Sequence, residues 1–121
     1  MTDRGQRSFR FVVEKRGEVT EVGFMDTKIL DEASIDDIGR QLFELVKQHP
    51  SIKLLLDFST VQYLSSAALG MLITLNKRVA ETKGKLVLCS IRPQIYEVFK
   101  ITKLNLVFDI VGDERAALAH F

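Results

Sequence analysis

The sequence has a single cysteine among its 121 residues, which excludes an internal disulfide and a multi-cysteine metal site. The formal net charge is only +1, so there is no general attraction to nucleic acid or to anionic membranes. No uninterrupted apolar run approaches the length of a membrane span, and residues 1–7 lack the apolar core of a secretory signal. We therefore expect a cytoplasmic domain that neither inserts into membranes nor binds nucleic acid.

The residue sets that carry catalysis are also missing. The seven glycines are scattered singly, so neither common type of phosphate-cradling loop is present. His49 and His120 fall at predicted helix ends without a cysteine or a paired acid nearby, and Cys89 falls within an apolar strand. A cysteine in that setting behaves as a small core residue. We predict a protein that is not an enzyme and that uses no metal and no cofactor.

The composition is that of one globular domain. Hydrophobic residues make up 46% of the chain and charged residues 27%, so the chain can bury a core and is not expected to be disordered. A chain of 121 residues is long enough for one such core. We predict a flexible N-terminal tail over residues 1–8 and a single domain over residues 9–121.

The apolar pattern predicts a hairpin followed by alternating helices and strands. Apolar residues at every second position on both sides of Gly17 predict a hairpin over residues 9–25. Residues 26–32 are expected to form a loop. The later strands are predicted at 52–58, 86–89 and 106–111, and the nearly continuous apolar run over 52–58 is typical of a strand covered on both faces. The helices are predicted at 34–49, 66–82, 93–102 and 114–120, with Pro93 at the start of the third and Asp113 as the cap of the last. This order predicts an α/β domain with a mixed, mostly parallel sheet of about five strands and about four helices.

Three local features of the helices are predicted in more detail. Ser34 and Asp37 have the spacing of a capping box at the start of the first helix. Gly84 is expected to take the left-handed conformation that ends the helix over 66–82. That helix is expected to bury one face made of Leu69, Leu72, Ile73, Asn76, Val79 and Ala80, with further apolar surface beside it from Met71 and Leu75.

A pair of serines stands where the strand over 52–58 leads into the next helix. If Ser65 is the N-cap, Leu64 and Leu69 take the positions of a hydrophobic staple. Ser66 is then the first helical residue, and its hydroxyl is not needed for capping. The amide groups of a first helical turn favour negative charge, so Ser66 suits phosphorylation. The alternative from the local pattern is that the serines only cap the helix.

Residues 54–75, LLLDFSTVQYLSSAALGMLITL, closely resemble the signature of STAS domains of the anti-sigma factor antagonist type. In that family an apolar strand ends in Asp-Leu-Ser, and Asp-Ser-Ser/Ala-Gly-Leu-Gly precedes a helix. The resemblance extends over nearly the whole chain. It implies that the unphosphorylated protein binds an anti-sigma factor, usually itself a serine kinase, and so releases the sigma factor. The kinase phosphorylates the serine that aligns with Ser66, which abolishes binding, and a phosphatase restores it.

The resemblance also implies a partner-binding surface, made of Asp57, Ser59, Ser65 and Ser66 with the loop residues Asp26, Thr27 and Leu30. The sequence departs from the family pattern at two positions. Ser65 stands where an aspartate is usual, which makes Ser65 a rival phosphoacceptor, and Ala68 stands where a glycine is usual.

Two other functions are compatible with the same fold. The chain could be a STAS subunit of a transporter-associated or stress-signalling complex that is never phosphorylated. It could also be a sensor that holds an anion or a nucleotide at the start of the helix, although no basic residue lies within the serine junction to favour this.

Overall fold

A computed structural model describes residues 11–24, 28–29 and 32–121. The predicted tail over residues 1–8 lies outside these ranges. The helices are α1 (Glu32–Gln48), α2 (Ser66–Glu81), α3 (Pro93–Ile101) and α4 (Glu114–His120), with a 3-10 turn η1 at Leu104–Leu106. The strands are β1 (Phe11–Arg16), β2 (Val19–Phe24), β3 (Lys28–Ile29), β4 (Lys53–Asp57), β5 (Tyr63–Leu64), β6 (Lys85–Cys89) and β7 (Asp109–Val111).

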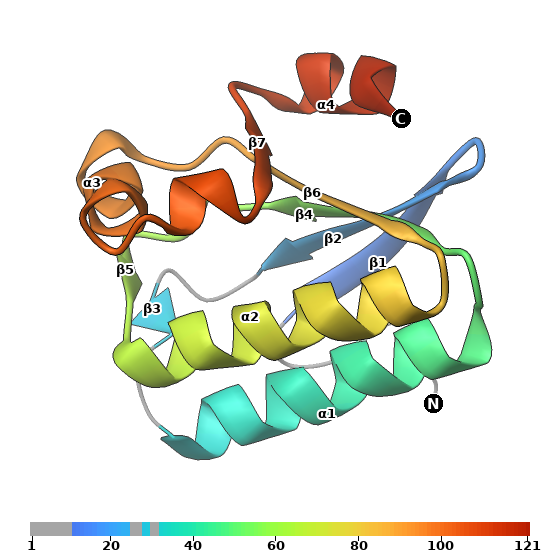
Figure 1. Cartoon of the computed structure of the whole chain (residues 1–121), viewed down its shortest axis with the longest axis horizontal. Coiled ribbons are helices and arrows are strands. Elements are labelled where there is room, and N and C mark those ends of the chain that lie inside the picture. The colour runs from blue at the N-terminus through green and yellow to red at the C-terminus, as the bar shows by residue number, and fades with distance from the viewer. Residues whose placement is uncertain (1–10, 25–27, 30–31) are drawn as a thin grey trace.

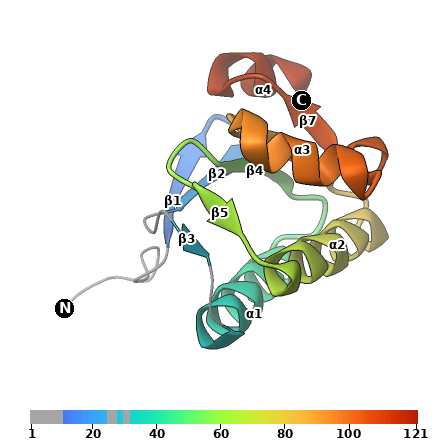
Figure 2. The same cartoon turned by 90° about the vertical axis from the view of Figure 1, so that its left-hand side faces the viewer.

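Five of the strands form one sheet in the order β1-β2-β4-β6-β7 (Figure 1). The hairpin strands β1 and β2 are antiparallel, and all other neighbours in this sheet are parallel. Helices α1 and α2 lie side by side against one face, and α4 lies over the opposite face (Figures 1 and 2). The predicted α/β fold, with its hairpin and its mixed, mostly parallel sheet, is confirmed.

The strand β4 is covered on both faces, as its continuous apolar run predicted. Leu54 and Leu56 point into a large core shared with α1 and α2. Leu55 points the other way, into a smaller core shared with Ala117 of α4. All three leucines are fully buried. The sheet therefore separates two cores of unequal size, and the smaller one depends on a single short helix.

The start of α1 differs from the prediction. The helix begins at Glu32, so Ser34 lies inside its first turn and the proposed capping box is wrong. The carboxylate of Asp37 instead accepts a hydrogen bond of 3.0 Å from the side-chain amide of Gln41, one turn later.

The loop predicted over residues 26–32 contains the short strand β3, which pairs in parallel with β5. Strands of two residues leave too little periodicity to be predicted from sequence.

The last predicted strand was placed too early. Only Asp109–Val111 is a strand, and the preceding residues form the turn η1. Lys103 adopts a left-handed conformation with φ of 63°, which ends the run of α3 and starts this turn. Phe108 then packs edge-on against Phe99 at 5.8 Å between ring centroids. The compact turn brings Phe108 into the core, where a continuous strand was expected.

The end of α2 also differs from the prediction. Lys83, not Gly84, takes the left-handed conformation, with φ of 64°. The amides of Lys83 and Gly84 donate to the carbonyls of Ala80 and Val79 at 3.0 and 2.9 Å, which is a Schellman motif. Glycine is required at position 84 for a different reason, since a Cβ there would lie 2.5 Å from the carbonyl oxygen of Ile52.

The buried face of α2 is rotated from the predicted one. Ile73 and Ala80 are exposed, and Asn76 is half-buried. The residues that are buried are Ala68, Met71, Leu72, Leu75 and Val79. The helix is apolar around much of its circumference, so only its contacts with the sheet and α1 decide which side is covered.

Candidate functional site

The serine junction is formed where β5 leads directly into α2. Ser65 has extended backbone angles, with φ of −82° and ψ of 167°, and its hydroxyl accepts a hydrogen bond of 3.1 Å from the amide of Ala68. Its carbonyl accepts the first helical hydrogen bond, from Leu69, at 3.1 Å. Ser65 is therefore the N-cap, as predicted. Leu64 and Leu69 both pack against the large core, at the positions expected for a staple.

Ser66 differs from Ser65 both in the exposure of its side chain and in the hydrogen bonding of its hydroxyl. It is exposed, whereas Ser65 is half-buried. Within the described part of the chain, its hydroxyl takes part in no hydrogen bond, while the Ser65 hydroxyl is engaged by the cap. The junction thus presents one free hydroxyl at the positive end of a sixteen-residue helix.

The pairing of β3 with β5 brings a distant segment to this junction. Ile29 is the register partner of Leu64, one residue before Ser65. Asp26, Thr27 and Leu30, which the resemblance assigns to the partner surface, lie outside the described residues. The backbone of Lys28–Ile29 nevertheless runs directly beside the approach to Ser65.

Asp57 and Ser59 are placed by a different set of contacts. The carboxylate of Asp57 accepts a hydrogen bond of 2.9 Å from the amide of Ser59, and the carbonyl of Ser59 accepts one of 3.3 Å from Arg92. The next residue, Thr60, donates to the carbonyl of Phe24 at 2.6 Å. These contacts fasten the loop between β4 and β5. Figure 2 shows this loop and the start of α2 on the same side of the molecule, with β5 running between them.

The carboxylate of Asp57 does not point toward Ser66. It lies on the α4 face of the sheet, where one carboxylate oxygen each of Asp57, Glu21 and Glu114 lie within 4.8 Å of one another. We call these three residues the carboxylate cluster. Its member Glu21 is only 4% exposed and accepts a hydrogen bond of 2.9 Å from Arg16. The sequence pattern missed this residue, because alternation along β2 assigned only one face of the strand to the core.

Burial raises the pKa of Glu21 to about 7, with a contribution from the Glu114 carboxyl, while Arg16 lowers it. Three carboxylates so close together also suggest a cation site. The guanidinium of Arg16 already contacts Glu21 and lies 3.8 Å from Glu114, so a cation would have to displace it. We therefore interpret the cluster as a set of acids neutralised by arginine and protons. Burial raises the pKa of the adjacent Cys89 thiol to about 12, in keeping with a core residue.

The model of the STAS domain family matches residues 12–117, which is nearly all of the chain and includes the serine junction. The chain belongs to the STAS domain family. The resemblance drawn from residues 54–75 is thereby confirmed, and the match covers both cores of the fold.

Particular STAS proteins are similar to this chain over different lengths. BtrV of Bordetella bronchiseptica, named as a candidate anti-sigma factor antagonist, is 33% identical over 69 residues, which is 57% of this chain and 60% of BtrV. The chain thus matches less than two thirds of that relative's length.

Solved STAS structures share the fold at lower identity. An anti-sigma factor antagonist domain protein from Planctomyces limnophilus has a TM-score of 0.77 and 23% identity, over 90% of this chain and 96% of that one. The Bacillus cell fate determinant SpoIIAA, solved in its phosphorylated form, has a TM-score of 0.71 and 16% identity, over 91% and 97%.

The surface of this STAS domain beside Ser66 is hollowed. A depression of about 270 Å³ lies between α1 and the first half of α2. Ala67, the residue after Ser66, forms part of its wall together with Gly39 and Gly70, whose lack of side chains opens the space. Its remaining lining residues are Ile35, Asp36, Phe43, Met71 and Thr74.

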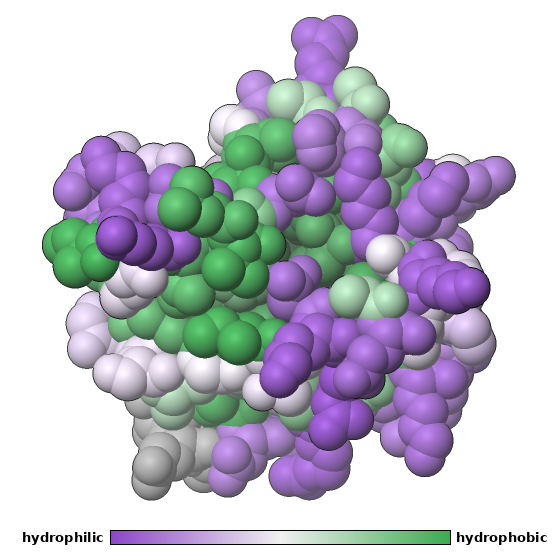
Figure 3. Space-filling view, viewed as in Figure 1, coloured by the Kyte–Doolittle hydropathy of each residue, from purple (hydrophilic) through white to green (hydrophobic). Residues whose placement is uncertain are grey.

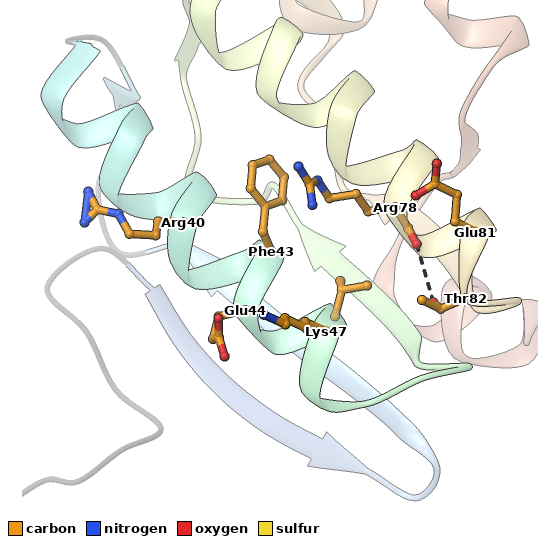
Figure 4. Close-up of a pocket in the computed structure, with 8 residues that line it drawn as sticks. Arg40, Phe43, Glu44, Lys47, Arg78, Glu81 and Thr82 are labelled. Atoms are coloured by element: carbon orange, nitrogen blue, oxygen red, sulfur yellow. Dashed lines mark hydrogen bonds between the residues drawn. The ribbon is translucent and has the colours of Figure 1, made fainter.

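A second depression, of about 350 Å³, lies further along the same two helices (Figure 4). There the guanidinium of Arg78 lies over the ring of Phe43, 4.8 Å from its centroid. Arg78 therefore covers an aromatic side chain. This depression is near the C-terminal ends of α1 and α2 and so is remote from the serines.

Figure 3 shows a hydrophobic patch on the face of the molecule that carries α2 and α3. Several large apolar side chains that sequence reasoning did not assign to the site are exposed. Tyr63 on β5 is 52% exposed and Ile73 on α2 is 36% exposed. Along the chain, Tyr63 precedes the serine junction and Ile73 follows it. Four more lie on α3 and the following turn: Val98, Ile101, Leu106 and Val107. Contiguous exposed apolar surface is typical of protein interaction sites.

Among the helices of the described residues, none combines the length and the hydrophobicity that a membrane span needs.

Proposed function

We propose that the protein is an anti-sigma factor antagonist that is switched off by phosphorylation of Ser66. The observation that carries this proposal is the division between the two serines. The Ser65 hydroxyl is held in the cap at 3.1 Å from the Ala68 amide, whereas the neighbouring Ser66 hydroxyl is exposed and has no hydrogen-bond partner among the described residues. Membership of the STAS family and the similarity to BtrV support the same function.

The switch acts through charge at the helix start. In its unphosphorylated form the surface around Ser66 binds an anti-sigma factor that is also a serine kinase, and the sigma factor is released. The Ser66 hydroxyl oxygen then attacks the γ-phosphorus of ATP in the kinase. A new O–P bond forms, the bond to the ADP oxygen breaks, and the hydroxyl proton passes to a base of the kinase.

Phosphoserine carries about −1.5 to −2 charges at neutral pH. The free amides of the first turn of α2 stabilise that charge, so the domain stays folded. The partner interface instead has to bury a dianion without a matching cation, and binding is lost. A phosphatase that hydrolyses the ester restores the binding form, and all of these steps belong to the cytoplasm.

The partner surface that we propose is centred on Ser66 and extends to β5 and β3. Ser59 and the loop residues Asp26, Thr27 and Leu30 belong to it, as the family resemblance implies. Tyr63 and Ile73 add apolar area, and the depression at Ala67 offers space for a partner side chain. Asp57 contributes indirectly, since its carboxylate holds the Ser59 amide at 2.9 Å while lying on the other face of the sheet. The chain itself supplies no catalytic group in this scheme.

Intact-mass spectrometry with ATP and an anti-sigma factor kinase from the same organism tests this proposal. We expect one phosphate on the wild-type protein and on Ser65→Ala, and none on Ser66→Ala. Binding of the kinase should be retained by the unphosphorylated protein and by Ser66→Ala, but lost by Ser66→Glu. A wild-type protein that stays unmodified while the kinase phosphorylates another of its substrates would contradict the proposed switch.

A further inference from the structure

Helix α4 is held on the sheet by a small apolar contact. It has seven residues, of which only Ala117 is fully buried, against Leu55, Val87 and Cys89. Leu118 and Phe121 pack beside it and are partly buried. A contact this small leaves the position of α4 sensitive to the charges at its edges.

The carboxylate cluster lies at the N-terminal edge of that contact. Glu114 opens α4, Asp57 ends β4, and Glu21 is buried on β2 between them and Arg16. The single guanidinium of Arg16 is divided among several acids, at 2.9 Å from Glu21, 3.1 Å from Glu14 and 3.8 Å from Glu114. Within the part of the chain that the structure describes, one positive charge therefore faces three clustered carboxyl groups, and it is also shared with a fourth acid, Glu14.

Among the described residues, Arg16 is the cation that acts on Glu21, and Arg115, which follows Glu114 on α4, is exposed. Glu14 is its register partner on β1. From β6, the group that faces the cluster is the Cys89 thiol, whose pKa the three acids help to raise. At the far end of α4, Lys85 donates to the carbonyl of His120 at 2.7 Å, and the His120 ring lies 3.9 Å from Asp109. The two ends of the helix are thus held by separate polar contacts.

We propose that α4 is a proton-controlled cover over the back of the sheet, closed when Glu21 holds a proton and loosened when Glu21 is charged beside the other two carboxyl groups. Loosening relieves the repulsion because it carries Glu114 away from Glu21 and Asp57 and admits water to Glu21. It also uncovers Leu55, Val87 and Cys89, which lie on the face opposite α2. Since Asp57 holds the Ser59 amide, the loop leading to the serine junction starts from this cluster.

The pH range follows from the difference between the closed and open states. In the closed state burial raises the pKa of Glu21 from its ordinary value of 4.5 to about 7. A solvated Glu21 in the open state returns toward its ordinary value. The closed state therefore binds the proton more tightly. The free energy that favours the closed state over the open state declines as the pH rises from about 4.5 to 7, and it is constant above that range.

Hydrogen exchange of the whole protein, measured by mass spectrometry on the peptide covering residues 114–121, tests this proposal. After correction for the intrinsic effect of pH on exchange, we expect the opening of α4 to increase by at least about tenfold between pH 5 and pH 7.5. Alkylation of the single cysteine by N-ethylmaleimide, normalised to a free thiol, reports the same opening. It should rise in parallel between pH 6 and pH 7.

Two variants remove the proposed cause, and two others serve as controls. Glu21→Gln should abolish most of the dependence on pH while keeping α4 closed at pH 7.5. Glu114→Gln should weaken the dependence and keep α4 closed, because it removes the contribution of the Glu114 carboxyl to the raised pKa of Glu21 and leaves that of burial. Glu18 lies on the same hairpin, but it pairs with Lys53 outside the carboxylate cluster. The variant Glu18→Gln should therefore behave as wild type. His120→Gln, which removes the histidine at the other end of α4, should also retain the dependence.

The proposal is overturned if corrected exchange and alkylation are independent of pH in the wild-type protein, or if His120→Gln alone abolishes the dependence. It is also overturned if both glutamine variants open more readily than wild type at pH 7.5. Should Glu21→Gln fail to fold, Glu114→Gln decides the matter, because Glu114 is half-exposed and its replacement leaves the core unchanged.

Discussion

Replacing Ser65 by alanine removes one hydrogen bond, the one of 3.1 Å that its hydroxyl accepts from the amide of Ala68. Loss of an N-cap side chain costs about 0.5–2 kcal/mol. Ala68 is fully buried, so water can reach its amide only through the space that the hydroxyl leaves. We therefore expect a loss of about 1–2 kcal/mol in the free energy of unfolding, which lowers the melting temperature by about 3–8 °C.

The matched change at Ser66 should have almost no effect on stability. Ser66 is exposed and its hydroxyl has no hydrogen-bond partner in the described structure, so Ser66→Ala should change the free energy of unfolding by less than about 0.5 kcal/mol. Ser65→Asp offers a carboxylate oxygen to the same amide, and we expect it to restore the cap. Urea unfolding followed by circular dichroism measures all three variants.

The two serines should also separate in the phosphorylation assay. Ser65→Ala should be less stable but still phosphorylated, and Ser66→Ala should be fully stable but never phosphorylated. If Ser66→Ala were the destabilised variant, Ser66 would be the cap and Ser65 the free hydroxyl. The division between the serines, and the function proposed from it, would then be wrong.

Three further changes test the packing. Gly84→Ala places a Cβ 2.5 Å from the Ile52 carbonyl oxygen, so urea unfolding should show a loss of about 1–3 kcal/mol in the free energy of unfolding. Gly70→Ala is the control, because its Cβ would lie in open space and should not destabilise the protein. Leu56→Ala empties a fully buried site and should cost about 2–5 kcal/mol, while Ile101→Ala, 77% exposed, should leave the melting temperature unchanged. Asp113→Ala removes the 2.8 Å cap of α4 and should speed alkylation of Cys89 at every pH, and an unchanged rate would show that α4 does not gate this thiol.

Much of the fold was predictable because its signals are local. The continuous run of β4 predicted a strand buried on both faces, Pro93 marked the start of α3, and Asp113 marked the cap of α4. The assignment of Ser65 as the cap depended only on residues within a single turn of helix. Each of these features is decided by neighbours in the sequence, whose spacing is fixed by backbone geometry.

The features that could not be predicted depend on residues far apart in the chain. The carbonyl of Ile52 requires glycine at position 84, and the pairing of Lys28–Ile29 with Tyr63–Leu64 places a predicted loop beside the serine junction. Glu21 is buried because α4, more than ninety residues later, covers the second face of β2 near Arg16. Alternation along a strand tells which residues share a face, but not whether another element returns to cover it. The sequence by itself determined most of the helices, the longer strands and the cap at Ser65, because those signals are local. Only the tertiary structure decided which charges meet, because that depends on how distant segments pack.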